Sequence, residues 1–167
     1  VFTLEATNHL VPRWYSEGIS MHEEWEARPN WGERITPDFI AAFTEGKLLP
    51  VATLDRGFIR PSYENQVVVS YFQAGLTCQM IDRQWGADKL LRLLEAFAKD
   101  TLTAEAIQQV LQIAPEEFDK RLQVYVTELL GPLAEKEGLQ HWRAEMKQAA
   151  AAAREEKWDD VMAPATR

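Results

Sequence analysis

The sequence predicts an almost entirely α-helical chain, and three observations lead to this prediction. Apolar residues recur at helical spacing in most segments. Cap-type hydroxyls, prolines and glycines separate these segments as helix start and stop signals do. No segment sustains the alternation of a strand, and the β-branched runs at 51–54 and 67–69 are short. The 167 residues therefore allow one helical core and an appended piece.

The first fully punctuated helix begins at Thr36 and ends at Gly46. The hydroxyl of Thr36 can cap the helix, Pro37 suits the first turn, and Asp38 complements the helix dipole. Gly46 stands where a left-handed residue would end the helix. The next segment, 47–61, contains two prolines and a glycine and predicts an irregular connection.

The longest predicted helix spans 62–85 and is stopped by Gly86. Its apolar residues lie on more than one side of the helix, which predicts burial on more than one face. Shorter amphipathic helices are predicted at 87–98 and 103–111. Together these segments predict a multi-helix bundle.

The last helix of this core is predicted to begin at Pro115 and to end at Gly131 and Pro132. We therefore expect a helical domain over 1–131 and a linker with further helices over 132–167. An alanine run at 149–153 makes a strong helix former with little bulk. This trailing part resembles the start of a tetratricopeptide-type repeat, which would need further repeats to bury its face.

The charge of the chain argues against two classes of partner. Eighteen Lys and Arg stand against twenty-six Asp and Glu, a formal net charge of −8. This charge opposes a phosphate backbone or an anionic lipid surface, and no apolar run is long enough to span a bilayer. We expect no nucleic acid partner and no membrane insertion. Cys78 is the only cysteine, which excludes an intrachain disulfide.

The histidines do not form a complete zinc motif within this chain. Only His9, His22 and His141 are present, and none lies four residues from another. The nearest imitation of HExxH begins at His22 but has Glu26 where the second histidine should be. This segment is instead predicted to be a solvated helix end, with His22 and its acidic neighbours facing water.

The segment from Val11 to Ser20 resembles the one that follows HExxH in the gluzincin metallopeptidases, the clan of thermolysin and aminopeptidase N. The resemblance lies in Trp14 followed by the pair Glu17 and Gly18. In that clan two histidines from one helix and a glutamate from the next helix bind zinc, which leaves a fourth position for water. The resemblance implies that Glu17 is the third zinc ligand. The alternative is a surface carboxylate on an amphipathic helix.

The same resemblance places HExxH at or just before Val1, with residues 1–4 as the tail of its helix. We therefore expect zinc in the intact parent protein, none in this fragment, and no activity of this chain alone. Met21 departs from the pattern, since thermolysin-like relatives carry an aspartate there that orients a zinc histidine. Either another acid such as Glu24 takes this role, or the site is weaker than the motif suggests.

A second resemblance lies at the start of the long predicted helix. The segment 62–66, Ser-Tyr-Glu-Asn-Gln, resembles the Tyr-Glu-Lys-Gly segment of aminopeptidase N-like enzymes. It implies that Tyr63 is a catalytic residue whose phenol donates a hydrogen bond to the tetrahedral oxyanion. Asn65 and Gln66 replace the Lys-Gly of the family. The alternative is a half-buried packing tyrosine.

Three functional hypotheses follow. The first is the C-terminal helical lobe of a gluzincin-like zinc peptidase, followed by a repeat-like helix pair, whose intact parent hydrolyses a peptide or protein substrate. The second is a non-catalytic helical protein–protein interaction module. The third is an unrelated all-α domain, in which Glu17 would point to open solvent far from Tyr63. Apolar surface left uncovered in the fragment predicts a possible homodimer, and a bacterial periplasmic or extracytoplasmic parent is one expectation for the localisation.

Overall fold

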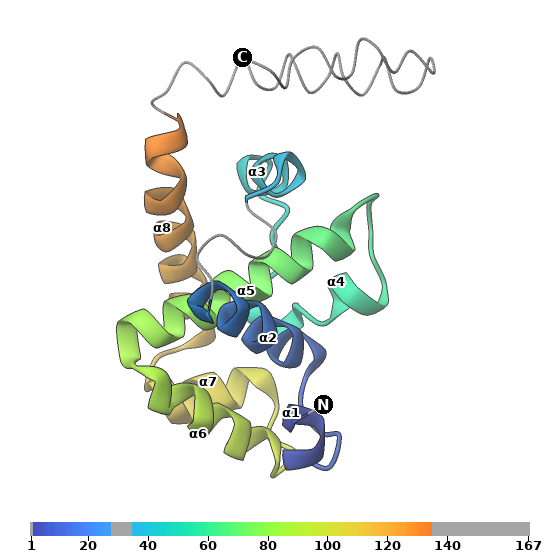
Figure 1. The fold of residues 1–167 in the computed structure, drawn as a ribbon, viewed down its shortest axis with the longest axis vertical. Helices are drawn as coiled ribbons and strands as arrows, with labels where there is room; N and C mark the ends of the chain where they lie inside the picture. Colours follow the sequence, from blue (N-terminus) through green and yellow to red (C-terminus); the bar gives the residue numbers. More distant parts are fainter. Residues whose placement is uncertain (1, 28–34, 135–167) are drawn as a thin grey trace. The chain divides into compact units, whose positions relative to one another are not determined.

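The computed structural model describes residues 2–27 and 35–134, and these residues are helical, without any strand (Figure 1). The elements, in chain order, are α1 (Phe2–Ala6), α2 (Arg13–Ala27), α3 (Pro37–Thr44), the 3₁₀ turn η1 (Val51–Thr53), α4 (Arg56–Ile59), α5 (Gln66–Trp85), α6 (Ala87–Phe97), α7 (Thr103–Leu111) and α8 (Pro115–Ala134). The prediction of an all-α, multi-helix chain is confirmed. The alanine-rich segment and the repeat-like helices predicted after residue 134 lie outside the described residues.

The chain divides into two compact units, 1–125 and 126–167, so that the division falls inside α8. The predicted domain boundary at residue 131 stays a prediction. The predicted helix end is wrong by three residues, because α8 continues through Gly131 and Pro132 to Ala134. A proline in the last turn removes a single backbone hydrogen bond close to where the helix ends anyway. The account below concerns the first unit.

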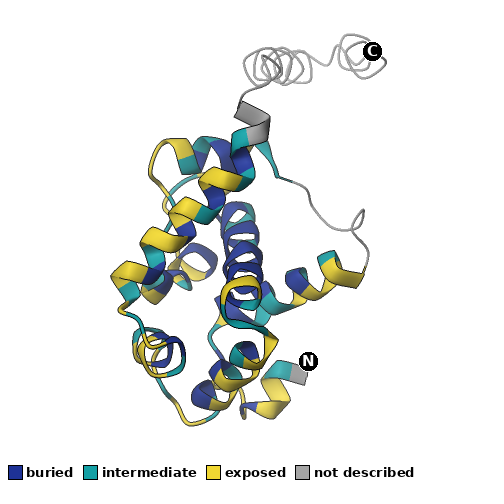
Figure 2. Ribbon diagram, turned by 90° about the vertical axis from the view of Figure 1, so that its left-hand side faces the viewer, coloured by how far each residue is buried: buried dark blue, intermediate teal, exposed yellow. Residues whose placement is uncertain are grey.

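Helix α5 is the centre of this unit, and α2, α3, α4 and α6 all pack against it (Figure 1). Figure 2 shows this central helix almost wholly buried, whereas the surrounding helices keep an exposed side. Burial on more than one face was predicted and is confirmed. The predicted start at 62 is too early, because Asn65 has a left-handed backbone (φ +64°) that separates the preceding turn from the helix.

The connection 47–61 is held by side chains of its neighbours. The buried amide of Gln73, on α5, donates from Nε2 to the carbonyl of Leu49 at 2.5 Å and accepts from the N–H of Leu49 at 3.2 Å. The N–H of Val51 donates to Asp119 Oδ1 at 2.9 Å. Because these backbone groups are satisfied by side chains, a segment without regular structure can lie against the core.

Helix α2 approaches α5 closely at Gly18. A Cβ at this position would lie 2.5 Å from the carbonyl oxygen of Ala74 and 3.0 Å from Cys78 Sγ. Only glycine fits such an approach. The neighbour that requires this glycine is therefore α5.

The first turn of α2 is fixed by three long-range hydrogen bonds. The N–H of Trp14 donates to Asp55 Oδ1 at 2.7 Å, and its indole Nε1 donates to Thr103 Oγ1 at 3.1 Å. Tyr15 Oη donates to the carbonyl of Leu90 at 2.5 Å. Both rings are 1% exposed and contact Phe97 edge to face. The rotation of α2, and with it the direction of each of its side chains, is therefore set by the core.

Candidate functional site

Glu17 lies in the second turn of α2, with 32% of its side chain exposed. Its carboxylate Oε1 is 3.4 Å from Nε of Arg13, one helical turn earlier. An ion pair of this kind at partly exposed positions contributes about 0.3–0.5 kcal/mol. The pair is weak enough for another cation to displace the arginine.

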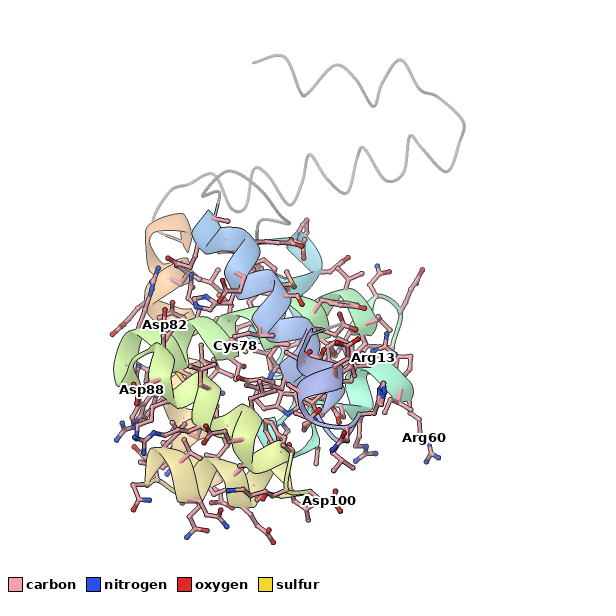
Figure 3. The ribbon with its side chains drawn as sticks, turned by 60° about the horizontal axis from the view of Figure 1, so that its bottom comes forward. Arg13, Arg60, Cys78, Asp82, Asp88 and Asp100 are labelled. Carbon is pink, nitrogen blue, oxygen red and sulfur yellow. The ribbon has the colours of Figure 1, made fainter. Side chains whose placement is uncertain are left out.

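Arg13 connects Glu17 to two aromatic residues of neighbouring elements. Its Nη2 donates to Tyr71 Oη, on α5, at 3.5 Å, and its guanidinium lies 5.6 Å from the ring centroid of Phe58, on α4. The Phe58 and Tyr71 rings meet edge to face at 5.0 Å. The interaction with Tyr71 and, to a smaller extent, the charge of Glu17 raise the pKa of Arg13. Figure 3 labels this arginine at the start of α2.

Tyr63 lies just before α5, in different surroundings. Lys47 Nζ is 5.4 Å from the centroid of its ring. Its Oη is buried and has no hydrogen-bond partner in the described part of the chain. Burial raises the pKa of this phenol, although Lys47 acts in the opposite direction. The hydroxyl therefore keeps its proton at neutral pH and can donate it in a hydrogen bond.

The two residues implied by the resemblance thus have different partners, Arg13 for Glu17 and Lys47 for Tyr63. The tyrosine hydroxyl that reaches the surroundings of Glu17 is that of Tyr71, through Arg13. Tyr71 is one of the residues at apolar positions of the predicted helix 62–85. Its spacing carried no signal of a polar role, because a tyrosine on a buried helix face is also an ordinary packing residue.

The region of His22 differs from the prediction. Its acidic neighbours Glu23, Glu24 and Glu26 are exposed, as predicted. His22 itself is buried, with 4% of its side chain exposed, and its Nε2 lies 3.2 Å from Asp82 Oδ2. The expectation of a water-facing histidine is wrong because α5 brings a carboxylate beside the imidazole, which lets the ring be buried with one nitrogen paired.

Position 21, which carries an aspartate in thermolysin-like relatives, is used for packing here. Met21 and Trp25 lie against Gly75 of α5, where an added Cβ would be 3.1 Å from Met21 Cβ. Glu24, the acid that could substitute, is exposed. An apolar side chain at the interface between α2 and α5 serves the core and cannot orient a metal ligand by hydrogen bonding.

The described residues do not complete a zinc site. Residues 2–27 and 35–134 hold no group of three or more His, Cys, Asp or Glu side chains that could bind a metal ion. Structural and catalytic zinc sites need at least three protein ligands. Glu17 supplies one carboxylate, and Arg13 neutralises it.

Comparison with known proteins places this sequence in a class of metallopeptidase-like domains. The family model described as Peptidase MA superfamily matches residues 2–128. The chain therefore belongs to the Peptidase MA superfamily. No curated protein and no solved structure matches the chain. Among the described helices, none is both long enough and apolar enough to cross a bilayer.

Proposed function

We propose that this chain is the helical part of a zinc-dependent metallopeptidase of the gluzincin type, whose intact form hydrolyses peptide bonds in a peptide or protein substrate. The observation that carries the proposal is the superfamily match over 2–128, which includes the segment with Trp14, Glu17 and Gly18. Glu17 would be one zinc ligand. Two histidines and the general base would come from an HExxH helix that precedes Val1 in the parent protein, and this chain alone would be inactive.

The packing of α2 supports a ligand role for Glu17. Hydrogen bonds from Trp14 and Tyr15 fix the helix one turn before the carboxylate. Gly18 then holds the following turn against α5. A metal ligand must be held on a rigid element if its geometry is to be reproducible. The half-exposed carboxylate and its weak pairing with Arg13 leave it available to a stronger cation.

Tyr63 would act by donating a hydrogen bond to negative charge that develops on the substrate. Its hydroxyl is protonated, buried and without a hydrogen-bond partner in the described residues. A donor that is already desolvated costs little reorganisation when charge appears beside it. In this proposal Glu17 sits in a concave region and the Tyr63 hydroxyl lies on the same side.

A second candidate function is a non-catalytic helical interaction module descended from such a peptidase. Two observations favour it, namely the packing role of Met21 and the pairing of Glu17 with Arg13. In this function the chain retains the superfamily fold, and position 21, which orients a metal ligand in thermolysin-like relatives, packs against α5 instead.

Bound zinc in a longer protein distinguishes the two functions. The chain is extended by about thirty residues at its N-terminus, enough to include an HExxH helix, and zinc is measured by elemental analysis. We expect stoichiometric zinc that is lost in Glu17→Gln and kept in Glu95→Gln, a matched change at an exposed position of α6. Absence of zinc from all three proteins would leave the interaction module. Zinc kept in Glu17→Gln would show that another residue is the ligand.

A further inference from the structure

A pocket of about 580 Å³ lies mainly between α2 and α6, and Glu17 is not among the residues that line it. Its size falls in the range of small-molecule sites. Most of its wall is apolar, and its large aliphatic side chains are Ile19, Leu90, Leu91 and Leu94. Leu91 is 62% exposed, which is high for a large apolar residue. The wall can therefore bury an apolar body.

His22 forms part of the pocket wall and has an unsatisfied nitrogen. Because the carboxylate of Asp82 can only accept, Nε2 of His22 carries the proton in their 3.2 Å contact. In the neutral tautomer with its proton on Nε2, the ring has a lone pair on Nδ1, and this atom is buried without a hydrogen-bond partner among the described residues. Buried polar atoms in native proteins nearly always have a partner. In this tautomer, Nδ1 can accept a hydrogen bond from a donor such as an N–H group.

Among the described residues, the charged side chains of the pocket wall are all acidic. Asp82, Glu23 and Glu26 line it, and no lysine or arginine of the described part of the chain does. Glu23 and Glu26 are exposed, so they are placed to attract a cation rather than to support the core. Figure 3 shows Asp82 near the end of α5, well away from Arg13 at the start of α2. Arg13, the cation that pairs with Glu17, therefore does not neutralise these carboxylates.

We propose that this pocket is a binding site for a small apolar organic cation, an amine or guanidine with an apolar body. The body lies against the leucines of α6, the positive charge lies among the three carboxylates, and an N–H group supplies the donor for His22 Nδ1. Two observed features agree on this chemistry, the apolar wall and the sign of the charge, and the unpaired Nδ1 of His22 is consistent with it in the tautomer described above. The site is separate from Glu17 and does not depend on the peptidase proposal.

Three probes of equal chain length and different charge test the ligand chemistry on the chain as it stands. Hexylamine, hexanol and hexanoate are titrated while amide resonances of Ile19 and Leu90 are followed by NMR. We expect hexylamine to bind most tightly and hexanoate most weakly, with the ¹⁵N resonance of His22 Nδ1 shifting for hexylamine. Equal affinities for the three probes, or no shift in the pocket residues, would overturn the proposal.

A charge variant tests the role of the carboxylates. The double variant Glu23→Gln, Glu26→Gln changes two exposed residues and should keep the fold. We expect it to weaken hexylamine binding by about two- to tenfold, the effect of two exposed charges, and to leave hexanol binding unchanged. Glu24→Gln is the matched control, since Glu24 is exposed on the same helix but does not line the pocket. An equal loss in the control, or no loss in the double variant, would contradict the assignment.

Discussion

Replacement of Gly18 by alanine should destabilise the protein through a single close approach between two helices. The new Cβ would lie 2.5 Å from the carbonyl oxygen of Ala74 and 2.8 Å from its carbonyl carbon. Non-bonded atoms of this kind rest at about 3.5 Å, so α2 and α5 would have to separate by about 1 Å. The obstacle is backbone of the central helix, which cannot rotate away as a side chain can.

The expected free-energy change is the balance of two effects. Overpacking a filled interface costs about 1–3 kcal/mol, and more where backbone must move. Alanine in place of glycine gains about 1 kcal/mol of helix propensity. Because α3, α4 and α6 also pack against α5, we expect the upper end of the cost and a net loss of about 2 kcal/mol. For a chain of this length that loss lowers Tm by about 4–8 °C.

Gly75→Ala provides the matched comparison within the same interface. There the added Cβ would lie 2.6 Å from the ring carbon Cη2 of Trp25, a half-buried side chain that can turn aside. We expect a net loss below about 1 kcal/mol. Thermal and urea unfolding of the three proteins, followed by circular dichroism, measures both changes. A Tm of Gly18→Ala equal to or above that of the parent chain, or a larger loss for Gly75→Ala, would refute this reasoning.

Two further predictions concern α2 and its neighbour. Asp55→Ala removes the acceptor of the Trp14 N–H and should cost about 1 kcal/mol in urea unfolding, whereas Asp55→Asn keeps an acceptor oxygen and should cost less; equal losses would contradict the capping role. Cys78 is 0% exposed and burial raises the pKa of its thiol, so an aromatic disulfide reagent should label it only as the chain unfolds. Prompt labelling of Cys78 in the native protein would contradict this prediction.

Helix ends that depend only on adjacent residues could be predicted from the sequence. The hydroxyl of Thr36 accepts from the N–H of Phe39 at 3.2 Å, and Gly46 has φ +67°, as the start and stop of α3 require. Gly86 likewise ends α5. These features depend on a few adjacent residues, so a single sequence contains enough information to predict them.

Features that depend on distant contacts could not be predicted in the same way. The short helix α4 lies in a segment predicted to be irregular, and its start is tied to α2 by the bond from Trp14 to Asp55, 41 residues apart. The burial of His22 depends on Asp82. The link from Tyr71 to Arg13 joins residues 58 positions apart. In each case the partner is supplied by tertiary packing, which helical periodicity does not encode.

The two hydrogen bonds between Gln73 and Leu49 have a consequence for how this domain can vary. The side-chain amide of Gln73 both donates to and accepts from the backbone of Leu49, as the backbone of a neighbouring β-strand would. The connection before η1 is thereby registered to one point on the central helix. Insertion of a residue between Leu49 and Val51 would break either the two hydrogen bonds between Leu49 and Gln73 or the hydrogen bond from Val51 to Asp119. A segment with the appearance of a loop should therefore tolerate changes of sequence better than changes of length.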